Sequence, residues 1–385
     1  MDKDYKGSFK WIVGSQYFLY FGVLGIFLPY FNLYCYHLGF SGFQIGALSA
    51  LRSVALVLFA LVWSALADHF QIRKPIYILC SFISTAIWVF YLYTVDFWVM
   101  LVITFFYGIF YSPIISFLEA FTMDVLGKGK KSYGKIRVWG SISFILTVII
   151  LGKIIDLYSI NIILILILTG SILQAVISTR IPDIQIEKQG AFSLKAKALL
   201  KRRVIIFLFS AFLMLVSHGT YYGFFSIHLD NLGYESTFIG ITWALASISE
   251  ILVMVNSEKI FKRFSLENVL VFSFMIAALR WFTLFIARSP IVIMISQISH
   301  AVTYGTFHMA SILYIDFLTP DDAKTLGQAI NNAVTYGLGM MVGFFMSGYL
   351  YESMGSFVLF MISGFIALAG GILLRMAQMM EFHSL

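Results

Sequence analysis

Charged side chains are scarce in this chain. Asp, Glu, Lys and Arg make up 12% of its 385 residues, whereas hydrophobic residues make up 60%. Soluble domains carry roughly 25% charged residues, so the composition excludes an ordinary water-soluble fold. A chain that cannot cover a water-facing surface needs lipid as its main solvent, and helices satisfy their own backbone hydrogen bonds there.

Residues for metal, redox or covalent chemistry are equally sparse. The two cysteines, Cys35 and Cys80, stand in apolar surroundings without metal or redox spacing. Glycine-rich phosphate loops are absent, which argues against ATP-driven pumping, and the inner loops offer no metal-spaced His and Asp residues and no nucleophile motif. We therefore expect no metal, no cofactor and no enzymatic activity.

Long apolar runs are abundant, by contrast, and they predict membrane-spanning helices. A bilayer core needs about twenty apolar residues per helix, and twelve segments meet this need. They cover residues 10–34, 42–67, 75–94, 97–124, 136–156, 160–179, 204–230, 237–260, 266–287, 290–317, 325–350 and 356–377. A polar stretch follows the sixth segment, so we predict an N-terminal six-helix bundle at 1–180, a cytoplasmic linker at 181–203 and a C-terminal six-helix bundle at 204–385.

The distribution of Lys and Arg predicts the orientation of these helices, since cytoplasmic loops are enriched in both residues. With both termini in the cytoplasm, 22 of the 26 Lys and Arg residues fall in inner loops or at inner helix ends. We therefore predict a multi-pass protein of the cell (inner) membrane. The cations that give the net charge of +7 then lie in loops that flank the membrane. Because they form no single soluble face, nucleic acid is not expected as a partner.

A weak internal repeat relates the two halves. After a shift of 194 positions, the stretch 30–46 shows five identities in 17 positions without a gap, including the Leu-Gly pairs at 38–39 and 232–233. Shared apolar composition is one explanation, and duplication of a six-helix unit is the other. Duplication would place a substrate site near the middle of the membrane, where the halves meet.

The loop between the second and third segments carries a recognisable motif. Residues 64–74 resemble the major facilitator loop signature G-x-L-A-D-R-x-G-R-R/K, with matches at Asp68, Arg73 and Lys74. The resemblance implies a gating loop in which Asp68 meets helix-end donors and cations at the inner face. The expected Gly, Arg and Gly are replaced by Ser64, His69 and Gln71, which weakens the expected closure of the loop.

Longer stretches resemble lactose permease and its relatives, and most closely the phenylpropionate permease family. They are Phe18 to Phe31, Leu118 to Phe121, Tyr133 to Ser141, Ser217 to Tyr222, Ser299 to His308 and Gly348 to Gly355, with Glu250, Arg280 and Trp281. The resemblance covers nearly the whole chain. It implies an all-α membrane protein of the major facilitator fold, with twelve transmembrane helices in two pseudo-symmetric six-helix bundles.

The same resemblance implies a secondary transporter. We expect a monomer that couples protons to the symport of a small organic solute, such as the aromatic carboxylate 3-phenylpropionate. A sugar or nucleoside symporter and a drug or metabolite exporter are the alternatives within transport. A non-transporting sensor is the alternative outside it, although no soluble output domain accompanies the membrane segments.

Ionisable residues inside membrane segments are costly, so each is a candidate site residue. Glu119 lies in the inner half of the fourth segment, and Arg137 opens the fifth. The resemblance to lactose permease maps this pair onto the Glu and Arg that engage the sugar there, and a guanidinium can bind a carboxylate or two hydroxyls bidentately. The alternatives are an ion pair that locks two helices and a simple positive-inside arginine.

Three further ionisable residues fall in the C-terminal half, at Glu250, Arg280 and His300. An unpaired carboxylate in mid-membrane would be mostly neutral and could bind and release a proton, although an interhelical hydrogen bond is a simpler role for Glu250. The resemblance places Arg280 and His300 in the proton-coupling and binding cluster. The acidic residue expected three positions after that histidine is Thr303 here, so Glu250, Glu119 and His300 are the candidate proton carriers.

Polar and aromatic side chains recur at three- or four-residue steps on several segments, which aligns them on one helix face. In the superfamily the first, fourth, seventh and tenth helices line the central cavity, and all four carry such stripes here. The predicted substrate-binding residues are Glu119, Arg137, His218, Tyr221, Tyr222, Arg280, His300, Tyr304, His308 and Asn331. The role of Arg52 on the second segment stays open. It could pair with an acidic group across the bundle, or it could bind an anionic substrate.

Overall fold

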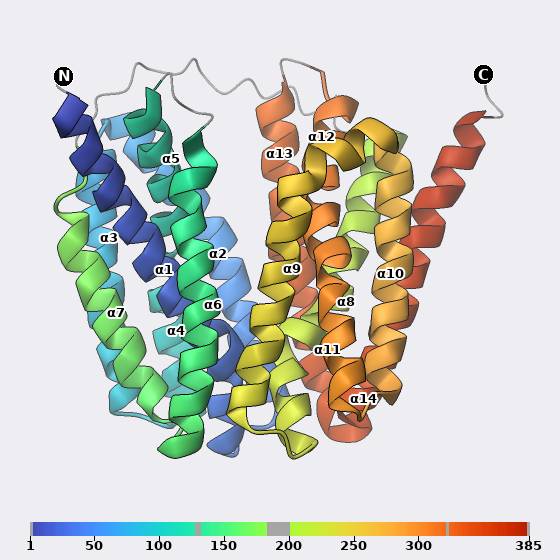
Figure 1. Cartoon of the computed structure of the whole chain (residues 1–385), viewed down its shortest axis with the longest axis horizontal. Helices are drawn as coiled ribbons and strands as arrows, with labels where there is room; N and C mark the ends of the chain where they lie inside the picture. Colours follow the sequence, from blue (N-terminus) through green and yellow to red (C-terminus); the bar gives the residue numbers. More distant parts are fainter. Residues whose placement is uncertain (1–2, 128–131, 183–200, 321–322, 383–385) are drawn as a thin grey trace. The chain divides into compact units, whose positions relative to one another are not determined.

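The computed structural model describes residues 3–127, 132–182, 201–320 and 323–382, and every regular element among them is helical (Figure 1). The elements are α1 (Lys3–His37), α2 (Gly42–Phe70), α3 (Arg73–Trp88), η1 (Val89–Leu92), α4 (Phe97–Tyr111), α5 (Pro113–Leu126), α6 (Tyr133–Leu157), α7 (Ile162–Ser178), α8 (Arg202–Asn231), α9 (Ser236–Arg263), α10 (Leu266–Ile286), α11 (Pro290–Ile298), η4 (Ala301–Thr306), α12 (Phe307–Leu318), α13 (Lys324–Asn332), η6 (Ala333–Gly339) and α14 (Met340–Phe382). Most of the predicted linker, at 183–200, lies outside the described residues.

The twelve predicted segments correspond in order to these helices, and several of them contain more than one element. The third joins α3 to η1, the fourth α4 to α5, the tenth α11 through η4 to α12, and the eleventh α13 through η6 to the start of α14. Gly355, at φ 70° and ψ 166°, separates the eleventh segment from the twelfth inside α14, and glycine adopts such a φ without steric cost. Among the described helices, nine are long and apolar enough to cross a membrane, and Ile162–Ser178 is a shorter apolar helix.

The chain forms two compact units, of which unit 1 holds most of the N-terminal half. It contains Met1–Phe40, Val54–Gly190 and Glu235–Ile241. Helix α1 packs along α6 and α7 in this unit. Inside its core, Tyr77 donates to Gln16 Oε1 at 2.9 Å, and Gln16 Nε2 donates to the Gln174 carbonyl at 2.9 Å. These polar side chains pair with one another because lipid and the packed core offer no water as a partner.

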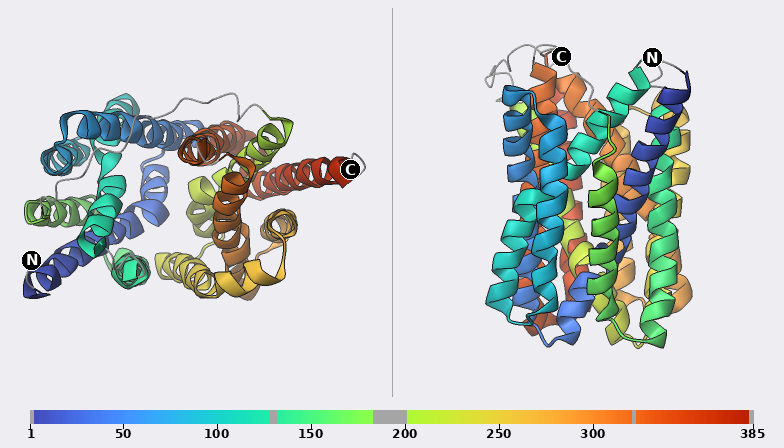
Figure 2. Two further views of the ribbon diagram at one scale, coloured as in Figure 1. Left: turned by 90° about the horizontal axis from the view of Figure 1, so that it is seen from above. Right: turned by 90° about the vertical axis from the view of Figure 1, so that its left-hand side faces the viewer.

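Unit 2 holds most of the C-terminal half. It contains Ser41–Ser53, Ala191–Tyr234 and Thr242–Leu385. Helix α8 packs on α14, η6 and α12, and α10 packs on α14, α12 and η4 (Figure 2). A side chain at Gly219 would lie 2.3 Å from the backbone of Gly343, so α8 and α14 are in direct backbone contact, as small residues allow between membrane helices.

Two helices contribute to both units. The first residues of α2 group with unit 2, and the first residues of α9 group with unit 1. The domain boundaries expected from hydropathy, at 1–180 and 204–385, stay a prediction.

Candidate functional site

A buried arginine is the centre of a polar cluster in unit 2. Arg280 lies in α10 and is 2% exposed. Its guanidinium donates from Nη1 to His300 Nδ1 at 2.7 Å and to Thr303 Oγ1 at 3.3 Å, and from Nη2 to Gln297 Oε1 at 2.9 Å. Because a guanidinium has donors only, these three acceptors fix its position.

Two aromatic rings cover the same guanidinium. Arg280 Cζ lies 4.3 Å from the centre of the Tyr221 ring and 4.7 Å from that of the Trp281 ring. The negative face of each ring stabilises the cation, and most strongly where water is excluded. The Tyr221 hydroxyl donates to Gln297 Oε1 at 2.9 Å, so a single amide oxygen holds both the ring and the guanidinium.

His300 connects the arginine to a carboxylate. Its Nε2 lies 2.8 Å from Glu250 Oε1, while its Nδ1 faces Arg280. Because Arg280 can only donate, Nδ1 carries the lone pair, and the ring proton is on Nε2 and points to Glu250. His300 is therefore neutral in this arrangement. The charge of Arg280 and that of an ionised Glu250 compensate each other through its ring.

Glu250 is the accessible edge of this cluster. Its side chain is 20% exposed, whereas that of His300 is 4% exposed. Tyr222 and Tyr304 are half-buried, and the Tyr222 hydroxyl lies 3.3 Å from His300 Nε2. Glu250 and these tyrosines are therefore the more exposed part of the cluster, and Arg280 is the enclosed part.

The remaining predicted residues of α8 and of the tenth segment surround the same cluster. The Tyr304 ring stacks on His300 with centroids 5.3 Å apart, and the His308 ring follows at 6.3 Å. His218 is fully buried, donates from Nδ1 to the Met214 carbonyl at 2.8 Å and packs edge-on against a tryptophan. The predicted residues that the structure brings together are His218, Tyr221, Tyr222, Glu250, Arg280, His300, Tyr304 and His308.

Two other predicted residues of interest lie elsewhere in unit 2. Asn331 in α13 is fully buried and accepts a hydrogen bond from Thr335 Oγ1 at 3.2 Å, while its Nδ2 has no hydrogen-bond partner in the described structure. Arg52 is half-buried in α2. A substrate-binding role for Asn331 stays a prediction, and the role of Arg52 stays open.

The charged pair predicted for the N-terminal half lies in unit 1. Glu119 is exposed on α5, Arg137 is half-buried on α6, and the two are within electrostatic range. The Arg137 guanidinium lies over the Phe21 ring at 3.9 Å and near the Tyr17 ring at 5.4 Å. Packing over a ring leaves the in-plane N–H donors of Arg137 directed away from that ring, which suits hydrogen bonding to an anion or to Glu119.

The predicted gating loop forms a small ion-pair network in unit 1. Arg73 lies 3.1 Å from Asp124 and 3.8 Å from Asp68. The side chain of Asp68 is 71% exposed and that of Asp124 is 22% exposed, so Asp124 makes the closer and less screened pair. The sequence motif did not include Asp124, which comes from α5. Lys74 is half-buried beside Arg73 in α3.

Gln71 in the same loop has a backbone conformation that favours glycine. Its φ is 56°, and it stands where the loop signature has glycine. Its Nε2 donates to the Asp68 carbonyl at 2.6 Å. The departure from the signature therefore puts backbone strain into the turn, since the left-handed conformation costs roughly 1–2 kcal/mol for most residues.

Sequence reasoning missed two residues that the structure places at the cluster. Gln297 precedes His300 by three positions, so helical periodicity was a signal that could have found it. Tyr336 in η6 has its hydroxyl 2.5 Å from His308 Nδ1, and it belongs to a pentapeptide that occurs twice in the chain.

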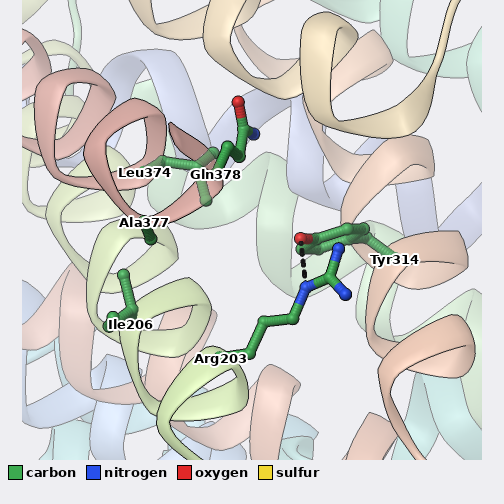
Figure 3. Close-up of a pocket in the computed structure, with 6 residues that line it drawn as sticks. All are labelled: Arg203, Ile206, Tyr314, Leu374, Ala377 and Gln378. Atoms are coloured by element: carbon green, nitrogen blue, oxygen red, sulfur yellow. Dashed lines mark hydrogen bonds between the residues drawn. The ribbon is translucent and has the colours of Figure 1, made fainter. Parts of the chain in front are cut away.

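A small pocket in unit 2 lies apart from this cluster (Figure 3). Arg203 at the start of α8 donates from Nε to the Tyr314 hydroxyl at 3.3 Å and pairs with Glu267 at 3.2 Å. Leu374 and Gln378 of α14 lie on the pocket's other side. Because Glu267 already neutralises Arg203, we do not assign this pocket to the site.

Fold and cluster together define a class of protein. Membrane-spanning helices carry a charge-compensated Glu, His and Arg relay, and ionisable residues inside membrane segments mark transport pathways. These are the features of a polytopic secondary transporter.

The chain belongs to the MFS_1 like family, whose model matches residues 10–362. It is similar to the "Probable 3-phenylpropionic acid transporter" of Escherichia coli (strain K12), at 27% identity over 353 residues that cover 90% of this chain and 92% of that protein. Maltose permease of Geobacillus stearothermophilus is 24% identical over 361 residues, 90% of each chain. The crystal structure of nucleoside transporter NupG matches with a TM-score of 0.83 at 19% identity, covering 95% of this chain and 98% of that chain. The predicted major facilitator fold and transport class are confirmed, and the chain is not an enzyme.

Proposed function

We propose that the protein is a proton-coupled symporter of a small organic anion, with an aromatic carboxylate such as 3-phenylpropionate as the favoured substrate. It acts by alternating access as a monomer in the cell (inner) membrane, with both termini in the cytoplasm. The observation that carries the proposal is the relay in unit 2, in which His300 contacts Glu250 at 2.8 Å and Arg280 at 2.7 Å.

The relay links a proton to an anion through charge balance. An ionised Glu250 compensates Arg280, and a proton on Glu250 removes that compensation. The buried guanidinium then carries a net positive charge in a medium of low dielectric constant, which is costly. A substrate carboxylate restores neutrality, so the proton and the anion each favour the binding of the other. Symport requires coupled binding of this kind.

The side chains around the relay suit the two ends of an aromatic carboxylate. The guanidinium of Arg280 offers paired donors that match two carboxylate oxygens, and binding would exchange one of its present acceptors for the substrate. Tyr222 and Tyr304 border the accessible edge at Glu250, where an aromatic ring can stack. The relative named for 3-phenylpropionic acid supports this substrate class.

The other predicted residues complete the proposal. Glu119 and Arg137 form a second polar group for the substrate or the proton. Asp68, Arg73 and Lys74 act as the gating loop, where Arg73 can hold α3 to α5 through Asp124.

A sugar or nucleoside symporter is the second candidate. His218 Nε2 and Asn331 Nδ2 are buried without a hydrogen-bond partner in the described structure, and the hydroxyls of a neutral solute would satisfy such atoms. The relatives named maltose permease and nucleoside permease support this candidate. An exporter of drugs or metabolites is a third, because these residues do not set the direction of transport.

Uptake into proteoliposomes tests the proposal. Purified protein is reconstituted with an alkaline interior and an acidic exterior, and radiolabelled 3-phenylpropionate, uridine and maltose are supplied separately. Accumulation of 3-phenylpropionate that exceeds the accumulation in protein-free liposomes, and that a protonophore abolishes, supports the main proposal. Accumulation of uridine or maltose alone selects the second candidate. Movement of these solutes only out of the alkaline interior, against the direction of proton entry, would indicate an exporter. Transport of none of them would refute the proposal.

A further inference from the structure

One pentapeptide occurs twice in the chain, and both copies adopt the same rare conformation. Ala-Val-Thr-Tyr-Gly forms residues 301–305 and again residues 333–337. The first copy lies in η4 and the second in η6, and both elements are π-helical. Such turns are uncommon and are frequent at functional sites, so two copies of one sequence in this state indicate a shared role.

The threonine and the glycine of each copy are buried, whereas the valine and the tyrosine are half-buried. The buried residues are Thr303, Gly305, Thr335 and Gly337. The first threonine accepts a hydrogen bond from Arg280, and the first glycine packs against Glu250, where a Cβ would lie 3.4 Å from Cγ. The π-helical turn therefore anchors on the relay and directs its tyrosine to the accessible side.

The two presented tyrosines, Tyr304 and Tyr336, lie side by side. Their ring centroids are 6.1 Å apart with planes at 80°, an edge-to-face arrangement that aromatic pairs favour. The Tyr304 ring is nearly parallel to those of His300 and His308, at 14° and 10°.

We propose that the two Ala-Val-Thr-Tyr-Gly turns build an aromatic subsite next to the relay, and that Tyr336 is a specificity-determining residue for the ring of the substrate. The inference rests on the proposed function, in that the acidic or polar end of the same substrate lies at the Glu250–His300–Arg280 relay. His308 holds the Tyr336 hydroxyl at 2.5 Å, so the ring is fixed before a substrate arrives. Recognition then requires little loss of side-chain freedom.

Ligand binding to variants of Tyr336 tests the inference. Tyr336→Phe keeps the ring, and Tyr336→Leu removes it while keeping an apolar side chain. Tyr349→Leu is the matched control, because Tyr349 lies on the neighbouring helix α14 and is 67% exposed. Affinities are measured by calorimetry, with thermal shift as a check on folding, for 3-phenylpropionate, the ringless carboxylate hexanoate, uridine and maltose.

We expect Tyr336→Leu to weaken binding of the ring-bearing ligand by about tenfold, because an aromatic pair contributes affinity beyond the area that it buries. Tyr336→Phe keeps the ring but loses the hydroxyl contact with His308, so it should weaken binding less than Tyr336→Leu does. Tyr349→Leu should bind that ligand within about twofold of the native protein, and hexanoate, where it binds, should not distinguish the variants. Equal loss of hexanoate and 3-phenylpropionate in Tyr336→Leu, or no loss of either, would overturn the inference. Both Tyr336 variants lose the hydroxyl contact with His308, so thermal shift serves only to show that each variant is folded when its affinity is measured.

The outcome separates this inference from the proposed function. If the native protein binds uridine and not 3-phenylpropionate, the aromatic-carboxylate proposal fails, while a weakened affinity of Tyr336→Leu for uridine still supports the subsite. If 3-phenylpropionate binds equally well to the native protein and to Tyr336→Leu, the subsite fails and the proposed function stands. Binding of maltose alone overturns both.

Discussion

Arg280 is a residue whose surroundings decide what it can bind. Three acceptors and two rings hold its guanidinium, and its compensating charge, Glu250, is one histidine away. Direct pairing with a carboxylate would saturate the arginine. The neutral His300 ring separates Glu250 from Arg280, so the charges of the cluster still compensate each other. The guanidinium can then exchange one of its acceptors for a substrate oxygen.

Glu250→Gln should separate proton coupling from substrate binding. The amide keeps the shape of the side chain but cannot take up a proton at transport pH. We expect gradient-driven accumulation to vanish, from a native level of up to about tenfold per pH unit of gradient, while exchange of internal for external substrate continues. Labelled uptake and exchange assays in proteoliposomes measure the two activities.

The control for this variant is Glu258→Gln, one further carboxylate of α9. Its side chain is 79% exposed and pairs with Lys262, so its neutralisation should leave both assays unchanged. Normal gradient-driven uptake by Glu250→Gln would show that the proton is carried elsewhere, and Glu119 would become the next candidate.

Two variants of Gln297 should separate its contribution to stability from its effect on substrate affinity. Gln297→Leu removes the acceptor of both Arg280 and Tyr221, and each buried unsatisfied donor costs about 1–3 kcal/mol. Gln297→Glu keeps the acceptor and adds a charge beside the guanidinium, so the protein stays folded while a substrate carboxylate must displace a built-in one. We expect a lowered melting temperature for the first variant and an affinity for 3-phenylpropionate reduced more than about tenfold for the second. A stable Leu variant, or a Glu variant that binds normally, would contradict this role.

At the scale of elements, the turn between α2 and α3 contains avoidable strain. Gln71 has a φ of 56°, and its side chain donates to the Asp68 carbonyl. Gln71→Gly relieves the strain and should raise stability by about 1 kcal/mol, seen as a higher apparent melting temperature in detergent. Gln71→Ala is the control, since it loses the hydrogen bond and keeps a Cβ. A Gly variant no more stable than the Ala variant would show that the turn is not strained.

Hydropathy predicts the membrane-spanning segments well but does not predict the π-helical turns within them. The tenth segment reads as a continuous apolar run at 290–317, yet it contains the π-helical turn η4, because a change of hydrogen-bond register leaves the side-chain composition unaltered. The same holds for η6 in the eleventh segment. Sequence similarity to lactose permease placed Arg280 and His300 in one cluster, whereas the tyrosine partner of His308 depends on how two helices align, which a single sequence does not show.

At the scale of the whole molecule, the two units differ in the polar groups that they enclose. Unit 2 holds the compensated relay of Glu250, His300 and Arg280. In unit 1, the charged pair consists of the exposed Glu119 and an Arg137 packed on aromatic rings. The polar groups of the two units therefore differ, and the proposed coupling chemistry belongs to unit 2.

Charge bookkeeping across the membrane gives a prediction that separates the two candidate functions. Because the relay carries one positive and one compensating negative group, one proton should travel with one monovalent anion, and the loaded protein moves no net charge. Uptake of 3-phenylpropionate should then respond to a pH gradient and not to a potassium–valinomycin potential, whereas a proton moving with a neutral sugar or nucleoside is worth about 2.3 kcal/mol per 100 mV. The measurement compares both driving forces in the same proteoliposomes, with Glu250→Gln as the uncoupled control. Uptake driven by an interior-negative potential would contradict the electroneutral cycle and favour the neutral solute.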